Sequence, residues 1–227
     1  MFHVEQPESL RSLLSSSAQE LGFVLSERHL SQFLQYLTEI LIWNQKVNLT
    51  GITDPREIVV KHILDSLAGS EAIRSDEKVS LLDIGSGAGF PGAALKIFRP
   101  DIELMLLEPH HKKAAFLRHV TGVLRLEKAF VNSDTLENFS VHLDHAFTHI
   151  TIRALRPEPH FPLIAKLLSS GGRLILYQSK AQALDDRSVK QARLMLDQEI
   201  SYSLPYGMGE RSLRILAPQC SLFHVEQ

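Results

Sequence analysis

The segment LLDIGSGAGFPG, residues 81–92, restricts the possible folds of this 227-residue chain more than any other part of it. An apolar run ends in Asp83, and four glycines follow between residues 85 and 92. Glycine allows the backbone to approach a ligand closely and to adopt positive φ angles. In open parallel sheets, ligands bind beyond the carboxyl ends of the strands, where such loops begin. The segment therefore predicts a strand, a ligand-binding loop and a helix through Ala93 and Ile97.

From Val79 onward, short apolar segments alternate with amphipathic ones. We expect strands at residues 79–84, 102–108, 128–133, 146–154 and 173–179, with helices at about 110–124 and 159–170. This alternation predicts a parallel sheet that is covered by helices on both faces. Residues 198–217 contain two further strand-like runs joined through glycines, which predicts an antiparallel hairpin. The expected fold is α/β: a Rossmann-like, mostly parallel, seven-stranded sheet that ends in an antiparallel hairpin.

The first seventy residues have the pattern of helices. In SERHLSQFLQYLTEIL, residues 26–41, large apolar residues recur at helical spacing after Ser26, which is suited to cap a helix. A second helix is expected to begin near Asp54, because an aspartate can cap it and Pro55 suits its first position. We therefore divide the chain into an N-terminal helical extension, residues 1–75, and a Rossmann-like domain, residues 76–227.

The composition is that of an ordinary globular protein, with 44% hydrophobic and 22% charged residues. No run approaches eighteen apolar residues, so we expect no membrane span. The first residues lack the apolar core of a secretory signal. Cys220 is the single cysteine and cannot form an internal disulfide, which indicates the reducing cytoplasm. The absence of a Cys/His cluster argues against a metal site.

The formal net charge of −2 does not give the basic footprint that is typical of nucleic-acid-binding proteins. Any contact with RNA would need a local basic patch. The candidate is HHKKAAFLRH, residues 110–119, in which Lys112, Lys113 and Arg118 stand without an acidic residue. For this segment taken alone, the solvated face of a helix is the favoured interpretation.

Three classes of ligand suit a glycine-rich loop after a strand. A mononucleotide P-loop needs Gly-Lys-Ser/Thr where Phe90 and Pro91 stand, and a dinucleotide fingerprint needs its third glycine at the position of Phe90. The spacing in this chain is Gly85-x-Gly87-x-Gly89. This spacing favours a ligand without a diphosphate, and S-adenosylmethionine is the cofactor that we expect.

Two carboxylates complete the expected cofactor site. Asp83 suits the charged ammonium or methionyl end of the cofactor, and Glu108 can accept hydrogen bonds from both ribose hydroxyls. Both residues could instead be strand-end carboxylates that cap the following helices. From these two residues alone, the binding role and the capping role are equally favoured. Dinucleotide sites use the same ribose acid, so an NAD-dependent oxidoreductase remains an alternative.

The signature DIGSGAGFPGAALKI, residues 83–97, resembles that of the bacterial ribosomal RNA small-subunit methyltransferase G family, the glucose-inhibited division protein B family. The resemblance continues, in the family's order, through residues 43–67, 150–155, 177–180 and 209–216. It implies an S-adenosylmethionine-dependent methyltransferase that makes 7-methylguanosine in 16S rRNA. The implied partner is 16S rRNA or the small ribosomal subunit, and we expect a cytoplasmic monomer without a metal. Methylation of another substrate, a small molecule or a protein, is the alternative.

The same resemblance implies residues of the cofactor site. By position these are Gly85, Phe90, the pair Leu136-Glu137 and Arg153. Adenine would lie against Leu136, with its amino group near an acceptor. Phe90 could instead anchor the helix that follows it, and Arg153 could form a salt bridge with an acid such as Glu108 or Asp83.

Methyl transfer to guanine N7 requires positioning rather than proton transfer, because N7 has an exposed lone pair and no proton. The N7 and O6 atoms are acceptors that arginine or lysine can hold. Arg153 and Lys180 are therefore the expected catalytic residues.

Two polar groups are assigned to packing rather than to chemistry. His62, Asp65 and Ser66 share one face of a helix. They could suggest a hydrolase triad, but a buried network that fastens the helical extension to the other domain is favoured. Trp43 and Asn48 could contact unpaired bases, since aromatic and amide groups suit them. We favour a packing role for Trp43 and a turn-capping role for Asn48.

The pentapeptide FHVEQ occurs twice, at residues 2–6 and 223–227. Phe-His-Val-Glu can be encoded by a sequence that is its own reverse complement, and the flanking residues extend this palindrome. We therefore interpret the repeats as traces of a palindromic protein-binding site in the DNA and assign no protein function to them.

Overall fold

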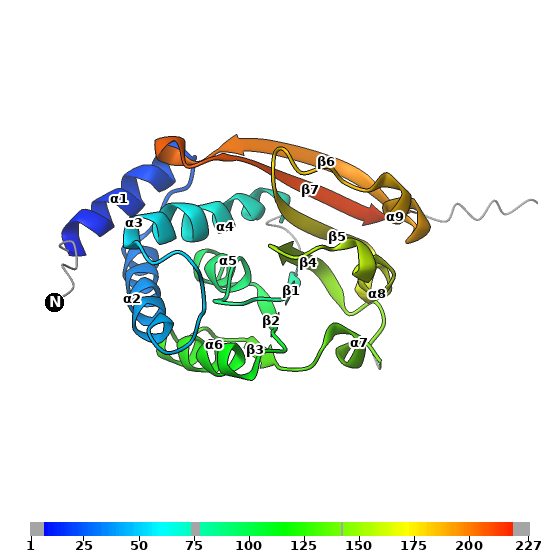
Figure 1. The fold of residues 1–227 in the computed structure, drawn as a ribbon, viewed down its shortest axis with the longest axis horizontal. Coiled ribbons are helices and arrows are strands. Elements are labelled where there is room, and N and C mark those ends of the chain that lie inside the picture. The colour runs from blue at the N-terminus through cyan, green and yellow to red at the C-terminus, as the bar shows by residue number, and fades with distance from the viewer. Residues whose placement is uncertain (1–6, 74–77, 142, 220–227) are drawn as a thin grey trace, which may run out of the picture.

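The computed structural model describes residues 7–73, 78–141 and 143–219 (Figure 1). The FHVEQ repeats and Cys220 lie outside these residues, and the palindrome hypothesis stays a prediction. The strands are β1 (Ser80–Ile84), β2 (Glu103–Leu107), β3 (Ala129–Asn132), β4 (Phe147–Arg153), β5 (Leu168–Ser179), β6 (Leu194–Ser203) and β7 (Glu210–Pro218). The main helices are α1 (Pro7–Glu20), α2 (Glu27–Asn44), α5 (Gly92–Phe98), α6 (His111–Val123), α7 (Leu136–Phe139), α8 (Phe161–Leu167) and α9 (Asp186–Gln191).

A single seven-stranded sheet forms the centre, in the order β3-β2-β1-β4-β5-β7-β6. Strands β1 to β5 pair in parallel, whereas β7 is antiparallel to both β5 and β6. The predicted parallel sheet with its antiparallel hairpin is therefore confirmed. The chain order reverses between β1 and β4, and ligands of open α/β sheets bind at such a switch point, beyond the carboxyl ends of the strands.

Two strands begin earlier than the sequence pattern indicates. Strand β5 begins at Leu168 rather than at residue 173, and its pairing with β4 shifts between Phe147 and His149. The shift admits the Gly171 turn, whose φ of +74° suits glycine. Strand β6 begins at Leu194 rather than at residue 198 and pairs along its length with β7. Pairing partners therefore extend both strands beyond their apolar runs.

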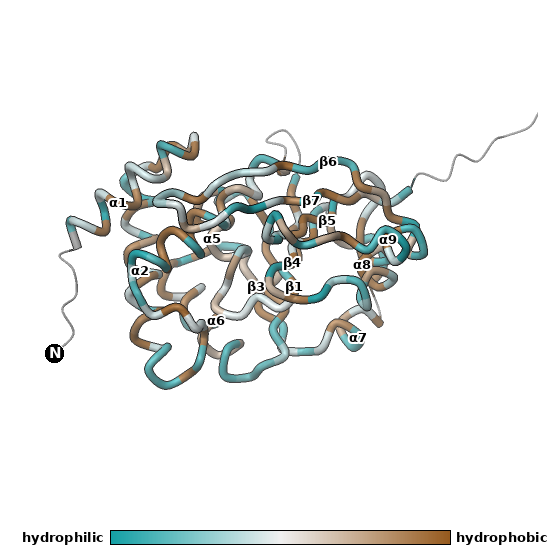
Figure 2. The backbone as a smooth tube through the Cα atoms, turned by 45° about the horizontal axis from the view of Figure 1, so that its top comes forward, coloured by the Kyte–Doolittle hydropathy of each residue, from teal (hydrophilic) through white to brown (hydrophobic). Residues whose placement is uncertain are grey.

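Helices cover both faces of the sheet, as predicted. One hydrophobic cluster lies between the sheet and α1, α2, α5 and α6, and the other lies between the sheet and α8 and α9. In Figure 2 the central strands are largely hydrophobic, whereas hydrophilic stretches lie at the outer turns. Within the residues that the structure describes, no helix is both long and apolar enough to cross a membrane.

The N-terminal helices pack directly on the glycine-loop side of the sheet. Ser26 caps α2 by accepting from the His29 amide, and Asp54 caps the next helical segment by accepting from the Glu57 amide. That segment runs through α3 (Pro55–Ile58), the π-helical η1 (Val59–Leu64), α4 (Asp65–Leu67) and the short η2 (Ala68–Ala72). One hydrophobic cluster continues from these helices into the sheet, and a domain boundary at residue 75 stays a prediction.

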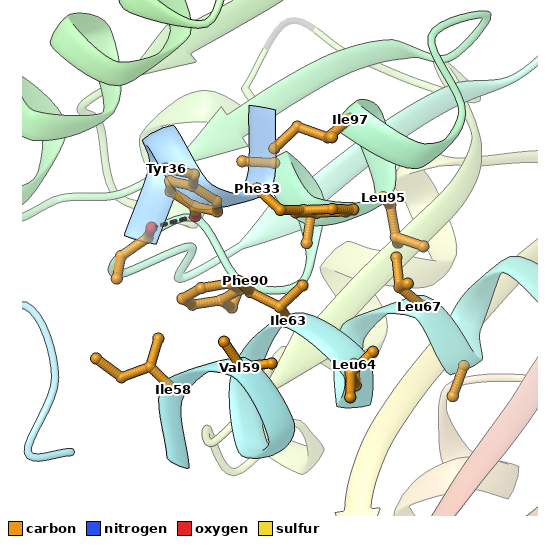
Figure 3. Close-up of a cluster of buried hydrophobic side chains, with 14 of the residues drawn as sticks. Phe33, Tyr36, Ile58, Val59, Ile63, Leu64, Leu67, Phe90, Leu95 and Ile97 are labelled. Atoms are coloured by element: carbon orange, nitrogen blue, oxygen red, sulfur yellow. Dashed lines mark hydrogen bonds between the residues drawn. The ribbon is translucent and has the colours of Figure 1, made fainter. Parts of the chain in front are cut away.

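Figure 3 shows how this cluster supports the glycine loop. The Phe90 ring lies between Tyr36 of α2 and the apolar side chains of η1, including Val59 and Ile63. The centroids of the Phe90 and Tyr36 rings are 5.2 Å apart. Phe90 therefore holds the loop against both N-terminal helices, and its contact with a cofactor stays a prediction.

Candidate functional site

The glycine-rich loop leaves β1 in a conformation that requires glycine. Gly85, Gly87 and Gly89 have φ angles of +70°, +58° and +95°. The buried Tyr36 hydroxyl donates to the Ala88 carbonyl, and a Cβ atom on Gly89 would lie 2.4 Å from that hydroxyl oxygen. The loop is thus held by α2 at a separation that only a glycine permits.

Asp83 is fully buried beneath this loop. Its carboxylate accepts from the Gly92 amide, at 3.2 Å, and from the Thr151 hydroxyl, at 2.8 Å. Burial raises the pKa of the Asp83 carboxyl to about 6, while these hydrogen bonds oppose the rise. Asp83 is not among the residues that line the adjacent cleft. Asp83 thus has the helix-capping contact that the sequence left open, and its contact with the charged end of a cofactor stays a prediction.

Glu108 stands at the carboxyl end of β2 and faces the cleft. Its Oε2 atom accepts from the Gly87 amide at 2.8 Å, and its Oε1 atom accepts from the His110 amide at 2.9 Å. A carboxylate offers about four acceptor positions. Glu108 can therefore brace the loop, hold His110 at the start of α6 and still accept from a pair of ligand hydroxyls.

A cleft of about 560 Å³ opens beside the loop, beyond the carboxyl ends of β1, β2 and β4. Its volume is in the range of small-molecule sites. Seven of the eight expected cofactor residues line it, namely Gly85, Gly87, Phe90, Glu108, Leu136, Glu137 and Arg153. Residues as far apart in the sequence as Gly85 and Arg153 are thus brought to one site, as the fold prediction requires.

The loop has few amides left for a diphosphate. The amides of Gly85, Ser86, Gly87, Gly89, Phe90 and Gly92 already donate to protein oxygens. In dinucleotide sites the pyrophosphate lies at the N-terminus of the first helix, and here the Asp83 carboxylate occupies that position. The geometry therefore argues against a nicotinamide dinucleotide and suits a nucleoside whose ribose meets Glu108.

His62 of η1 closes the cleft from the N-terminal side. Its ring stacks on Phe90 with centroids 5.0 Å apart, and its Nε2 atom lies 2.8 Å from the Thr50 hydroxyl. Nη2 of Arg153 lies 2.8 Å from Nδ1. Since arginine only donates, Nδ1 accepts and the proton resides on Nε2. Burial, with the nearby Arg153 charge, lowers the pKa of His62 to about 3, so the ring is neutral.

Arg153 ends β4 and joins the sheet to the helical segment. Its guanidinium donates to the Lys61 carbonyl and to His62, and it lies 3.3 Å from Asp65 and 3.4 Å from the Ser66 hydroxyl. The salt bridge therefore forms, but to Asp65 rather than to Glu108 or Asp83. Arg153 lines the cleft while it holds the helical wall in place.

Asp65 is the centre of a buried polar network. The Tyr202 hydroxyl donates to Oδ1 at 2.7 Å, and Arg211 lies 3.6 Å from the same oxygen. The Tyr177 hydroxyl donates to the Ser66 carbonyl at 2.7 Å. The hydrolase-triad alternative does not fit, because these contacts tie the helical segment to β5, β6 and β7. The network that the sequence favoured is present.

Other candidates lie away from the cleft. Lys180 is exposed and pairs with Glu210 at 3.5 Å, outside the lining of the cleft. The Trp43 ring packs edge-on against Phe116 at 5.6 Å. The turn after α2 is held by Asn44, which accepts from the amides of residues 49 and 50, whereas Asn48 is exposed. Trp43 therefore packs as expected, and the capping role belongs to Asn44 instead of Asn48.

A basic face borders the mouth of the cleft. Lys113 lines the cleft from the first turns of α6, and Lys112 and Arg118 are exposed on the same helix. Lys113 thus brings one residue of the segment that the sequence left as a solvated helix face to the edge of the site. Among the residues that the structure describes, no group of His, Cys, Asp or Glu side chains could hold a metal ion.

The family model described as GidB, rRNA small subunit methyltransferase G, matches residues 29–214. This chain belongs to the rRNA small subunit methyltransferase G family. It is 34% identical to the protein of that name from Geotalea uraniireducens, over 92% of this chain and 97% of the relative. The corresponding protein from Pelotomaculum thermopropionicum is 45% identical over 53% of this chain, and the match spans only half of that relative's length.

Solved structures show the same fold at low sequence identity. A SAM-dependent methyltransferase from Aquifex aeolicus superposes with a TM-score of 0.55 at 13% identity, over 74% of this chain and 96% of the other. A ribosomal protein L11 methylase from Lactobacillus delbrueckii gives 0.54 at 10% identity, over 70% and 79%. The Rossmann-like methyltransferase fold and the family assignment predicted from the sequence are thus confirmed. The family member described here is a methyltransferase with S-adenosylmethionine as its cofactor.

Several lining residues of this methyltransferase G family member were not found from the sequence. Thr50 and His62 come from the helical extension, and Leu155 and His160 follow β4. Their segments lie within or next to the family-like stretches at residues 43–67 and 150–155. Their position in or near these stretches was the sequence feature that could have indicated them. No spacing rule, however, shows which side chains of a helix or loop turn toward a cleft.

Proposed function

We propose that this protein methylates N7 of a guanine in 16S rRNA, with S-adenosylmethionine bound in the cleft beside the glycine loop. The observation that carries the proposal is Glu108, whose carboxylate braces the loop and still has acceptor positions for two ribose hydroxyls. The rRNA substrate follows the name of the matching family. The basic face at the mouth of the cleft supports an RNA substrate over a small molecule.

Each wall of the cleft has a part in holding the cofactor. Glu108 binds the ribose, and the half of the cleft lined by Leu136 and Glu137 receives the adenine. Gly85 and Gly87 let the backbone lie close to the ligand. Asp83 acts from below by fixing the loop through Gly92.

The reaction needs no general base. S-adenosylmethionine supplies a methyl group bound to a sulfonium. When bound, it would supply this methyl group to the lone pair of guanine N7, with a neutral thioether as the leaving group and the positive charge passing to the guanine ring. Catalysis then depends on holding donor and acceptor in line. His62 is neutral and already bonded on both ring nitrogens, so it contributes to the wall rather than to proton transfer.

Arg153 is proposed as the residue that aligns the two halves of the site. Its contacts with Lys61, His62 and Asp65 fix the helical wall relative to β4. We retain Lys180 as an RNA-contacting candidate at the edge of the sheet, because its ammonium is exposed. The rRNA substrate places the protein in the cytoplasm, where it is proposed to act as a monomer on the small subunit.

The proposal is tested by methyl transfer into small ribosomal subunits from a strain that lacks the corresponding gene. We expect one methyl group per subunit, mapped by mass spectrometry to N7 of one guanine. Calorimetry with S-adenosylhomocysteine and with NADH separates the cofactors, and only the former is expected to bind. Methyl transfer to protein or to another rRNA atom, or binding of NADH alone, would overturn the proposal.

A further inference from the structure

A second cleft, of about 390 Å³, lies beyond the carboxyl ends of β4 and β5, beside the first residues of β7. It shares Arg153, Ala154 and Leu155 with the wall of the first cleft. Two groups bound in the two clefts would therefore be separated only by the short segment that follows β4. In-line transfer requires donor and acceptor in such adjacent positions.

Leu155 forms the partition between the two clefts. Ala154 has a φ of +58°, and the turn carries the Leu155 side chain over the glycine loop, where a Cβ atom on Gly85 would lie 2.3 Å from Leu155 Cδ1. Leu155 nevertheless remains 45% exposed. An exposed leucine that is held in place between two clefts offers an apolar surface to a flat ring on its free side.

Arg156 is the cation of the second cleft that pairs with no group among the described residues. Arg153 and Arg211, which also line this cleft, both lie against the Asp65 carboxylate. Arg156 is exposed and forms no hydrogen bond or ion pair with the residues that the structure describes. A free guanidinium at the rim of a cleft is suited to bind a phosphodiester.

Gln178 supplies a buried donor at the same place. It is 7% exposed and lines the second cleft. Its Oε1 atom accepts from Arg214 at 2.6 Å, which fixes the orientation of the amide because arginine cannot accept. The Nε2 atom has no partner among the described residues. A buried donor without a partner is costly, and a ligand acceptor would satisfy it.

We infer that the second cleft binds the acceptor nucleotide, an unpaired purine nucleotide of RNA that turns its base into the protein. The base lies against Leu155, its phosphate is bound by Arg156, and Nε2 of Gln178 donates to O6. Guanine presents O6 and N7 as neighbouring acceptors. A donor to O6 alone leaves the N7 lone pair free for attack at the edge of Leu155, where the two clefts meet and the reacting atoms can come into contact. This inference rests on the proposed function and specifies the substrate side of the same reaction.

The test measures steady-state methyl transfer into undermethylated small subunits together with cofactor affinity. The variants are Arg156→Ala and Gln178→Glu. The latter still accepts from Arg214 but replaces the donor by a carboxylate oxygen. The matched control is Arg187→Ala, which removes an exposed arginine on α9 outside both clefts. Thermal melting checks that each variant is folded.

We expect Arg156→Ala to raise the KM for subunits about tenfold and to reduce the slope of log affinity against log salt by about one. Gln178→Glu is expected to lower kcat/KM at least about tenfold, because it faces O6 with an acceptor. The affinity for S-adenosylhomocysteine should stay within about twofold in both variants, and Arg187→Ala should behave as the wild type. Folded variants that keep the wild-type KM and kcat/KM would overturn the inference while leaving the proposed function intact. A wild-type protein without methyl transfer to rRNA would instead refute the proposed function itself.

Discussion

Replacing Gly89 by alanine tests the claim that α2 and the glycine loop are held at a separation only glycine permits. Gly87 provides the matched control, because both glycines have positive φ angles but different surroundings. A Cβ atom on Gly87 would meet nothing nearer than the Gly85 carbonyl oxygen at 3.9 Å. On Gly89 it would lie 2.4 Å from the Tyr36 hydroxyl and 3.0 Å from Cβ of Ala93.

The two substitutions should therefore differ in cost. Gly87→Ala should lower the free energy of unfolding by about 1–2 kcal/mol, because alanine is strained in a left-handed backbone conformation. Gly89→Ala adds overpacking against buried neighbours, for a total of about 2–5 kcal/mol. Since a domain is stable by about 5–15 kcal/mol, the variant should still fold. Its cofactor affinity should fall sharply, because the loop must move.

Tyr36→Phe makes the test sharper by removing the nearest clashing atom. Alone it leaves the Ala88 carbonyl without its donor, which costs about 1–3 kcal/mol. Combined with Gly89→Ala it should restore part of the lost stability, with a coupling energy of about 1 kcal/mol or more. No such coupling is expected between Tyr36→Phe and Gly87→Ala.

Urea unfolding, followed by circular dichroism, gives the free energy of unfolding for the wild type and the five variants. The reasoning is refuted if Gly89→Ala costs no more than Gly87→Ala. It is equally refuted if the Tyr36→Phe background leaves the cost of Gly89→Ala unchanged, because the contact with the hydroxyl would then have no energetic effect.

Three further predictions concern the polar contacts. His62 has a folded-state pKa of about 3, below its ordinary 6.5, so the unfolded chain binds the extra proton and stability falls as the pH drops below 6.5. Between pH 6.5 and 5 this loss is up to about 2 kcal/mol, and urea titrations should find it absent in His62→Gln. Glu108→Gln can no longer accept from the amides of both Gly87 and His110. Calorimetry should therefore show that S-adenosylhomocysteine binds about 10–100-fold more weakly. An unchanged affinity would contradict the proposed ribose contact. Tyr202→Phe removes a donor from buried Asp65 and should lower the free energy of unfolding by about 1–3 kcal/mol, whereas an unaltered melting curve would show that the contact is dispensable.

Much of the fold could be predicted because its signals are local. Ser26 and Asp54 cap helices in the way that their residue types indicate, and the apolar runs mark every strand of the sheet. The glycine spacing and the strand-end position of Glu108 likewise indicate where the first cleft lies, because carboxyl ends of parallel strands meet at one edge.

The direction in which a side chain turns could not be predicted in the same way. Asp83 and Glu108 both end strands, yet one points beneath the loop and the other into the cleft. The choice depends on strand pleat and on the neighbouring Thr151, which lies beside Asp83 only once β1 and β4 pair. The partner of Arg153 was likewise hidden, since Asp65 lies 88 residues away and meets it only through tertiary packing.

The Asp65 network has a consequence for the order in which the protein can be made. The helical segment that carries Asp65 leaves the ribosome before Tyr202 and Arg211, whose side chains contact the Asp65 carboxylate, have been synthesised. Until then, burying the Asp65 carboxylate would leave a negative charge with too few partners. The nascent chain therefore completes the wall of the cleft only after the hairpin of β6 and β7 emerges, so translation products that stop before this hairpin should bind no cofactor.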